Sequence, residues 1–281
     1  MTLAALNFAA IKHGVAEIPP LAFPVFRFGV GGIVLLAILW LREGSIVVRR
    51  ADVPTVVLAG LLAISLGQLG FVLALANTAA SDTALLFASG PIVTMAMATA
   101  VGIERPGRRH WAAALLGLLG FVMIVGGGPQ GLRLGADVLG YGSALISVAT
   151  TTAGTLMVLG LLRRYSPLRI LAWEMLAGTL FLVPLAIPGL ASIDPANVTA
   201  TALLALAYTT VLGGVVTNLL YFTAMGRVGP SRAAAFQYLQ VFLAVLLAVL
   251  LLGEHVTPIQ LAGGATIVTG IVIGRSSGLR R

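Results

Sequence analysis

The stretch PTVVLAGLLAISLGQLGFVLALA, residues 54–76, decides the fold class of this chain. It contains no Asp, Glu, Lys or Arg. As an α-helix it would rise roughly 35 Å, which is enough to cross the hydrocarbon core of a bilayer, roughly 30 Å thick. We therefore predict that it is a membrane-spanning helix.

The rest of the chain has the same character. Of its 281 residues, 59% are hydrophobic and only 9% are charged, whereas a soluble surface needs roughly 25–35% charged side chains. The apolar runs are continuous and do not alternate, so helices are expected rather than a β-barrel. We predict an all-α polytopic membrane protein with ten transmembrane helices. The expected spans are 2–16, 21–42, 54–76, 82–103, 109–126, 137–162, 168–190, 199–224, 232–252 and 256–274.

The first of these spans is short. As a helix, residues 2–16 would rise only about 22 Å. Either the bilayer thins locally around it, or the helix begins upstream of Met1. We expect the second.

The basic residues predict how the chain is oriented. Of its 17 Lys and Arg residues, 14 lie in the loops after the even-numbered spans or in the C-terminal tail. They are Arg42, Arg49, Arg50, Arg105, Arg108, Arg109, Arg163, Arg164, Arg169, Arg227, Arg232, Arg275, Arg280 and Arg281. The positive-inside rule then places both termini in the cytoplasm, in a bacterial-type inner membrane. The same rule accounts for the net charge of +8, so no nucleic-acid partner is expected.

The two halves of the chain are similar to each other. A shift of 150 residues pairs Ser81 with Ser231, Glu104 with Glu254 and Gly120 with Gly270, and a shift of 147 pairs Pro20 with Pro167 and Gly31 with Gly178. Five spans per half is an odd number, so the second copy would enter the membrane upside down. We expect two inverted repeats, residues 1–128 and 129–281, with a substrate site between them. Chance alignment of Ala-, Leu- and Gly-rich helices is the alternative.

Together these features resemble the drug/metabolite transporter superfamily, and specifically its ten-helix EamA-type exporters. The residues that carry the resemblance are Asn7 to Lys12, Pro20, Arg27, Phe28, Ala74, Leu75, Ser81 to Leu86, Pro91, Glu104, Pro230 to Ala234, Gly253, Glu254, Thr257 to Gln260 and Gly263. The resemblance implies a basket of helices 1–4 and 6–9 around a central cavity, braced by helices 5 and 10. It also implies export of amino acids, aromatic ones among them, or of related metabolites. The family usually has a longer helix 1, often with a Trp-Gly pair before the Asn.

Polar residues inside a span are candidates for function because burying them in lipid is costly. Gln68 and Phe71 share one helical face, and the shift of 150 takes them to Asn218 and Tyr221. Amides at these positions would suit the charged ends of a small zwitterion, and rings would suit its side chain. Alternatively, the amides join helices and the rings only pack.

The ninth span adds a second polar and aromatic group. Gln237 and Gln240 share a face, and Tyr238 lies beside them. Phe87 is the repeat equivalent of Gln237. Two amides in one apolar span favour a cavity that holds water or ligand. Asn7 in the first span is expected to join this lining because it also matches the family pattern.

The charged candidates lie deeper in the spans or at their ends. Arg27 and Glu174 are equivalent under the shift of 147. Arg27 would hold a substrate carboxylate or form a gate, or else it extends to the interface. Glu174 is too short to do so. Lys12 and His13, near the outer end of the first span, would either line the exit path or mark the interface.

Three further polar residues are expected to have structural roles. Trp173 would anchor the chain at the membrane interface, and His110 would be solvated. Glu104, which ends the fourth span, would cap the helix that follows it.

We predict a transporter that exports amino acids and related metabolites by alternating access, driven by the substrate gradient. The alternative is efflux of cationic drugs or toxic compounds by proton antiport through Glu174. A channel or scaffold without alternating access would not need the inverted repeat. We expect no enzyme, no catalytic residue, no metal and no cofactor, because the chain lacks cysteine, a nucleophile elbow and a His-Glu-x-x-His pair. The expected partners are the small-molecule substrate and the bilayer, with the protein as a monomer or weak homodimer.

Overall fold

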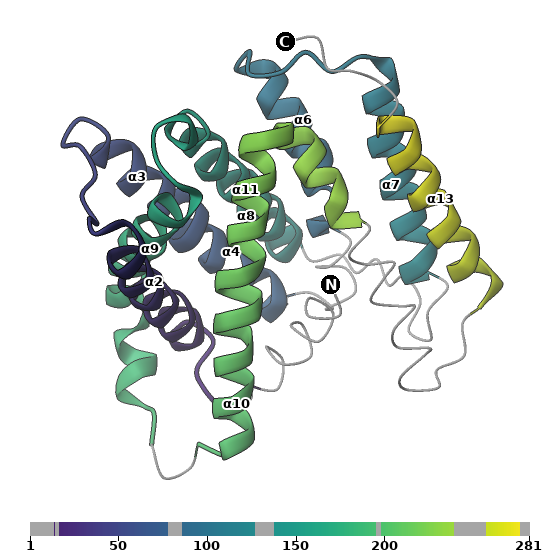
Figure 1. Cartoon of the computed structure of the whole chain (residues 1–281). Helices are drawn as coiled ribbons and strands as arrows, with labels where there is room; N and C mark the ends of the chain where they lie inside the picture. The colour runs from purple at the N-terminus through teal and green to yellow at the C-terminus, as the bar shows by residue number, and fades with distance from the viewer. Residues whose placement is uncertain are drawn as a thin grey trace.

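The computed structural model describes residue 14 and residues 17–77, 86–126, 138–194, 198–238 and 257–275. Within these residues all regular structure is helical (Figure 1). The elements are α2 (Ala22–Glu43), α3 (Val53–Gly60), η1 (Leu61–Leu66), α4 (Gly67–Asn77), α6 (Gly90–Ala100), α7 (Arg108–Gly126), α8 (Val138–Val158), η2 (Leu161–Arg163), α9 (Pro167–Ala191), α10 (Ala200–Tyr208), η4 (Thr209–Val216), α11 (Thr217–Val228) and α13 (Pro258–Arg275). Residues 230–238 are also helical.

The long helices confirm an all-α membrane protein. Five of the described helices are long and apolar enough to cross a bilayer: Ala22–Glu43, Val53–Asn77, Val138–Arg163, Pro167–Ala191 and Ala200–Val228. Each coincides with a predicted span to within a few residues. The predicted fourth span is interrupted by a turn at 88–89, and Pro91 lies in the first turn of α6, where its missing N–H is tolerated. The predicted first span and most of the ninth lie outside the described residues.

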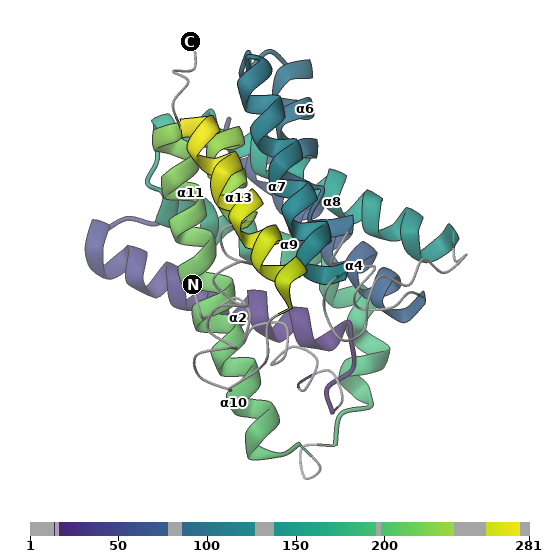
Figure 2. The ribbon, with the colours of Figure 1, turned by 90° about the vertical axis from the view of Figure 1, so that its right-hand side faces the viewer.

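Glycines set the closest helix contacts. Helices α2 and α9 cross in opposite directions: a Cβ on Gly29 would lie 3.3 Å from Thr179 Cγ2, and one on Gly32 would lie 2.7 Å from Leu176 Cγ. Helices α7 and α13 lie side by side in both ribbon views (Figures 1 and 2). There, a Cβ on Gly270 would lie 2.8 Å from the Ala113 carbonyl oxygen. At Gly270 the obstacle is a backbone atom, so a larger side chain there would force the two helices apart.

Two π-helical segments interrupt the long spans, and sequence reasoning missed both. Segment η1 joins α3 to α4, and η4 joins α10 to α11. A shift of 150 residues places η1 on 211–216, within η4. The widened turns free carbonyl groups, and Thr217 Oγ1 donates to the Leu212 carbonyl at 2.7 Å across one of them. Segments of this kind occur frequently at functional sites.

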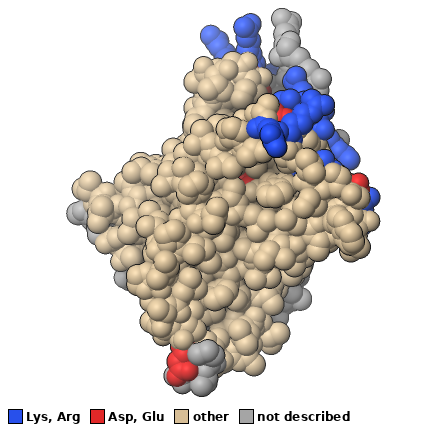
Figure 3. Space-filling view, turned by 90° about the vertical axis from the view of Figure 1, so that its left-hand side faces the viewer, with Lys and Arg blue, Asp and Glu red and all other residues tan. Residues whose placement is uncertain are grey.

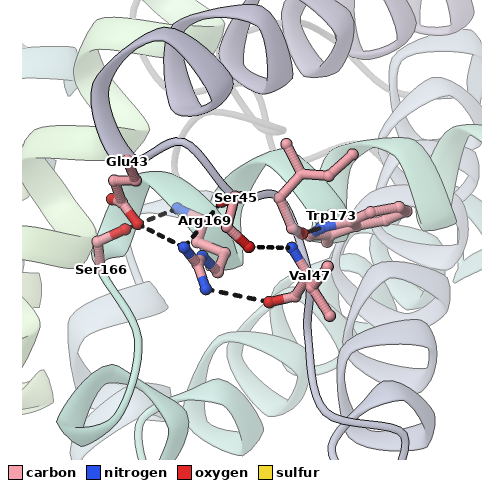
Figure 4. A network of polar contacts seen from close by, with 7 residues as sticks. Glu43, Ser45, Val47, Ser166, Arg169 and Trp173 are labelled. Atoms are coloured by element: carbon pink, nitrogen blue, oxygen red, sulfur yellow. Dashed lines mark hydrogen bonds and ion pairs between the residues drawn. The ribbon is translucent and has the colours of Figure 1, made fainter.

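Basic side chains gather at one end of the molecule on the face drawn in Figure 3. Near this end the α2–α3 loop is tied to the start of α9 (Figure 4). Arg169 pairs with Glu43 at 2.7 Å and donates to the Ser45 carbonyl at 2.8 Å and the Val47 carbonyl at 3.0 Å. The Trp173 indole N–H donates to the Ile46 carbonyl at 2.7 Å. Trp173 thus has a structural bond in addition to any interfacial role.

The structure corrects the prediction that Glu104 caps the helix that follows it. Instead of capping the next helix, its carboxylate accepts from the backbone N–H of Ser231 at 3.3 Å and from the Ser231 hydroxyl, at the start of the 230–238 helix. The preceding Gly229 has φ of +90°, and a Cβ there would clash with Glu104. The prediction was wrong because the partner is 127 residues away in the sequence.

Candidate functional site

A central cavity of about 400 Å³ lies among helices from both halves of the chain. Its walls are formed by residues of α2, α4, α6, α7, α8, α9 and α11, of both π-helical segments, of the 230–238 helix and of the turn before α6. The lining residues are Arg27, Phe28, Ala63, Ile64, Gln68, Phe87, Ala88, Pro91, Phe121, Thr151, Thr155, Leu171, Glu174, Gly213, Thr217, Asn218, Phe222, Gln237 and Tyr238. Mostly apolar walls with a few polar groups are typical of a small-molecule site.

A second cavity of about 220 Å³ adjoins the first. The two share Phe87, Thr151, Thr155, Thr217, Asn218, Phe222 and Gln237. Tyr221 lines the second cavity only. The shared wall makes the two cavities parts of one region between α8 and α11.

The structure brings most of the predicted site residues together. Seven of them line the central cavity: Arg27, Gln68, Phe87, Glu174, Asn218, Gln237 and Tyr238. Tyr221 lines the adjoining one. Phe71 packs edge-on against Phe87, with ring centroids 5.3 Å apart, and so supports the wall from behind. Asn7, Lys12, His13 and Gln240 lie outside the described residues.

The two repeat-equivalent amides have different surroundings. The Asn218 Nδ2 donates to the Gly214 carbonyl at 2.6 Å, so this amide satisfies a carbonyl of the π-helical segment η4. Gln68 lines the cavity and has no side-chain hydrogen bond to any other described residue. Gln68 therefore offers its full hydrogen-bonding capacity to the cavity, and Asn218 offers mainly its oxygen.

The two charged candidates both face the central cavity. Glu174 is 2% exposed, and its Oε2 is buried without a hydrogen-bond partner among the described residues. The Arg27 Nε donates to the Thr209 carbonyl at 3.2 Å, and its guanidinium lies 5.0 Å from the Phe28 ring centroid. The ion pairs found among the described residues do not join Arg27 to Glu174. Each charge is therefore placed at the cavity without neutralising the other.

Sequence reasoning missed the hydroxyl groups of the cavity wall. Thr151 and Thr155 are one turn apart on α8 and line both cavities. The Thr155 hydroxyl donates to the Thr151 carbonyl at 2.8 Å and can still accept from a ligand. The signal was available, because residues 150–152 are three consecutive threonines in an apolar span.

His110 was expected to be solvated, and this expectation was wrong. It is 5% exposed and lines a separate, largely apolar cavity of about 300 Å³ with Ser231 and Arg232. Pro91 and Tyr238 line both this cavity and the central one. Ile267 and Gly270 of α13 line the same cavity, and this packing of α13 near α7 could not be inferred from the loop sequence.

Comparisons with known proteins agree with this architecture. The model of the EamA-like transporter family matches residues 1–126 and 136–274. A solved structure aligns over 97% of this chain and 93% of its own with a TM-score of 0.82 and 18% identity, which shows a shared fold.

Three relatives illustrate what similar proteins are named for. The "Uncharacterized inner membrane transporter YedA" of Escherichia coli (strain K12) is 28% identical, over 95% of this chain and 85% of its own. The "Probable amino-acid metabolite efflux pump" of Salmonella typhimurium is 26% identical, over 95% and 89% respectively. The "Probable terminal-alkyne amino-acid exporter" of Streptantibioticus cattleyicolor is 28% identical, over 92% and 91%.

Proposed function

Because this chain belongs to the EamA-like transporter family, we propose that it exports amino acids and related small metabolites across the inner membrane by alternating access. The family and the relatives are transporters and not enzymes. The substrate class, the mechanism and the orientation with both termini in the cytoplasm are our proposals. The two relatives whose names mention amino acids support the first of these.

One observation carries the proposal: a single central cavity receives polar side chains from both halves of the chain. Arg27 and Gln68 come from the first half, and Glu174 and Asn218 from the second. A binding site at the boundary between two halves can be opened to either side by rocking one half against the other. The phenylalanine rings at 28, 87, 121 and 222 suit an apolar or aromatic side chain of the substrate.

The halves 1–128 and 129–281 would be inverted repeats related by a pseudo-two-fold axis. Around such an axis, contacts between the halves occur in pairs. If a residue of one half contacts a residue of the other, the repeat equivalents of these two residues also contact each other. The shift of 147 makes Gly29 equivalent to Leu176 and Gly32 equivalent to Thr179. Gly29 packs on Thr179 and Gly32 packs on Leu176, so the two contacts are equivalent to each other. This exchange supports inverted repeats over chance alignment of small residues.

Helices α7 and α13 support the same axis. A Cβ on Gly120 would clash with the Gly263 carbonyl, and one on Gly270 would approach the Ala113 carbonyl. A shift of 150 exchanges these two contacts as well. The pair lies on the outside of the bundle, where it would brace the two halves (Figure 2).

Contacts at the two ends of the molecule follow the same rule. Asp52, just before α3, pairs with Arg164 at 3.2 Å. Thr199, just before α10, donates its backbone N–H to Glu17 at 2.8 Å. A shift of 147 takes Glu17 to Arg164 and Asp52 to Thr199. The two equivalent contacts would lie at opposite membrane faces. One is an ion pair between Arg164 and Asp52, and the other joins the carboxylate of Glu17 to the neutral Thr199.

Counterflow in proteoliposomes tests the function. Vesicles are preloaded with a panel of unlabelled amino acids and cationic dyes, and entry of a labelled amino acid is followed. We expect stimulation by amino acids with apolar or aromatic side chains, without dependence on an imposed proton gradient. Entry that no preloaded compound accelerates would contradict the carrier mechanism.

Efflux of cationic compounds is a second candidate, favoured by the unpaired carboxylate of Glu174 beside aromatic rings. A carboxylate and ring faces together attract organic cations. Arg27 in the same cavity would repel them. Stimulation by the dyes alone would establish this alternative.

A further inference from the structure

We infer that Arg27 and Glu174 form the two charged poles of one site, which selects substrates carrying both a carboxylate and an ammonium group on an apolar body. The inference rests on the proposed export function and specifies its substrate class. Arg27 would hold the carboxylate, and Glu174 would hold the ammonium group. Simple anions and simple cations would each leave one pole unpaired.

The crossing of α2 and α9 positions the two poles. The helices touch where Gly29 and Gly32 meet Thr179 and Leu176. Arg27 precedes this contact on α2, and Glu174 precedes it on α9. Since the helices run in opposite directions, the two backbone positions lie about 5 Å from the crossing point, on opposite sides of it.

The surroundings of Glu174 leave room for an ammonium group. The side chain is 2% exposed, and no ion pair or side-chain hydrogen bond links it to another described residue. A buried carboxylate without a partner is strongly disfavoured. Within the cavity, a substrate ammonium group would be the missing partner.

The surroundings of Arg27 leave room for a carboxylate. Its Nε is engaged with the Thr209 carbonyl, and this bond fixes the guanidinium against η4. No carboxylate of a described residue lies within ion-pair distance of it. The terminal nitrogens of a guanidinium match a carboxylate in a two-bond arrangement. The Phe28 ring beneath the guanidinium adds a cation–π contact that holds it in place.

Apolar side chains line the same cavity beside the polar groups. Phe87, Leu171 and Phe222 line the same cavity as the two charges. A second charged group on the substrate would have to be buried against these side chains. The site therefore favours neutral amino acids with apolar or aromatic side chains over acidic or basic ones.

The test compares three probes that differ by one charge each. The probes are phenylalanine, phenylalaninamide, which lacks the carboxylate, and 3-phenylpropanoate, which lacks the ammonium group. In the counterflow assay the wild type is expected to prefer phenylalanine by about 10- to 100-fold over either analogue, the effect of one charged hydrogen bond.

Each glutamine variant should lose the preference for phenylalanine over one analogue and keep the preference over the other. Glu174→Gln is expected to exchange 3-phenylpropanoate as well as phenylalanine and still to reject the amide. Arg27→Gln is expected to exchange phenylalaninamide as well as phenylalanine and still to reject 3-phenylpropanoate. Glu174→Asp and Arg27→Lys keep the charges and should keep both preferences, which separates loss of charge from loss of folding. Arg42→Gln, on the exposed surface, is the neutral control.

The outcomes separate the two proposals. Suppose that the wild type exchanges phenylalanine, and that both glutamine variants either keep the full preference for phenylalanine or lose exchange of all three probes equally. The two-pole site is then wrong, and the export function stands. If the wild type exchanges no amino acid, the export function fails and the two-pole site fails with it.

Discussion

Replacing Ala88 with tryptophan is expected to abolish counterflow exchange while leaving the protein folded. Ala88 lies in the turn at 88–89 and lines the central cavity between Phe87 and Pro91. An indole in this position would occupy space that we assign to the substrate. The rate should fall to that of protein-free vesicles.

The matched control is Ile146→Trp on α8. Ile146 is 60% exposed and does not line the cavity, so the same bulk is added outside the transport path. Size-exclusion profiles of both variants in detergent should match that of the wild type. Exchange by Ala88→Trp at the wild-type rate would remove the cavity from the transport path.

Replacing Gly178 with leucine is expected to destabilise the protein more than any other change considered. A Cβ on Gly178 would lie 2.5 Å from the Gly60 carbonyl oxygen, and one on Gly60 would lie 2.7 Å from the Gly178 backbone nitrogen. Both obstacles are backbone atoms that cannot rotate away. Overpacking in well-packed interiors typically costs about 1–3 kcal/mol and sometimes more, so we expect a loss of at least about 3 kcal/mol.

Gly142→Leu on α8 is the control, because a Cβ at Gly142 has no heavy atom within 4 Å. Thermal unfolding in detergent, followed by tryptophan fluorescence, compares the two variants. Gly178→Leu should unfold well below the wild type or fail to yield monodisperse protein. Equal midpoints for Gly178→Leu and Gly142→Leu would show that the α3–α9 contact tolerates side chains.

The long spans could be predicted from sequence because hydrophobicity alone determines them. The run at 54–76 coincides with Val53–Asn77. The π-helical character of Leu61–Leu66 within that run was not predictable, since its residues are ordinary helix formers and tertiary packing decides the widened turn. The bond between Glu104 and Ser231 was missed for a related reason, because local capping rules consider only the adjacent helix.

Intramembrane polarity was the signal that drew attention to the polar residues of the cavity wall. Arg27, Gln68, Glu174 and Asn218 were singled out as costly polar groups in apolar spans, and all four line one cavity. Thr155 was missed because a threonine can satisfy its own hydroxyl on its helix, and so gives a weaker signal. Whether these side chains bind substrate stays a prediction.

The most direct test of alternating access uses a single cysteine, since the native chain has none. Thr155→Cys places a thiol in the wall shared by the two cavities. In oriented membrane vesicles, a membrane-impermeant maleimide is applied from each side in turn, with and without transported amino acid. Alternating access predicts that the thiol is labelled from both sides and that the amino acid protects it from both. Labelling from one side only, under every condition, would contradict it.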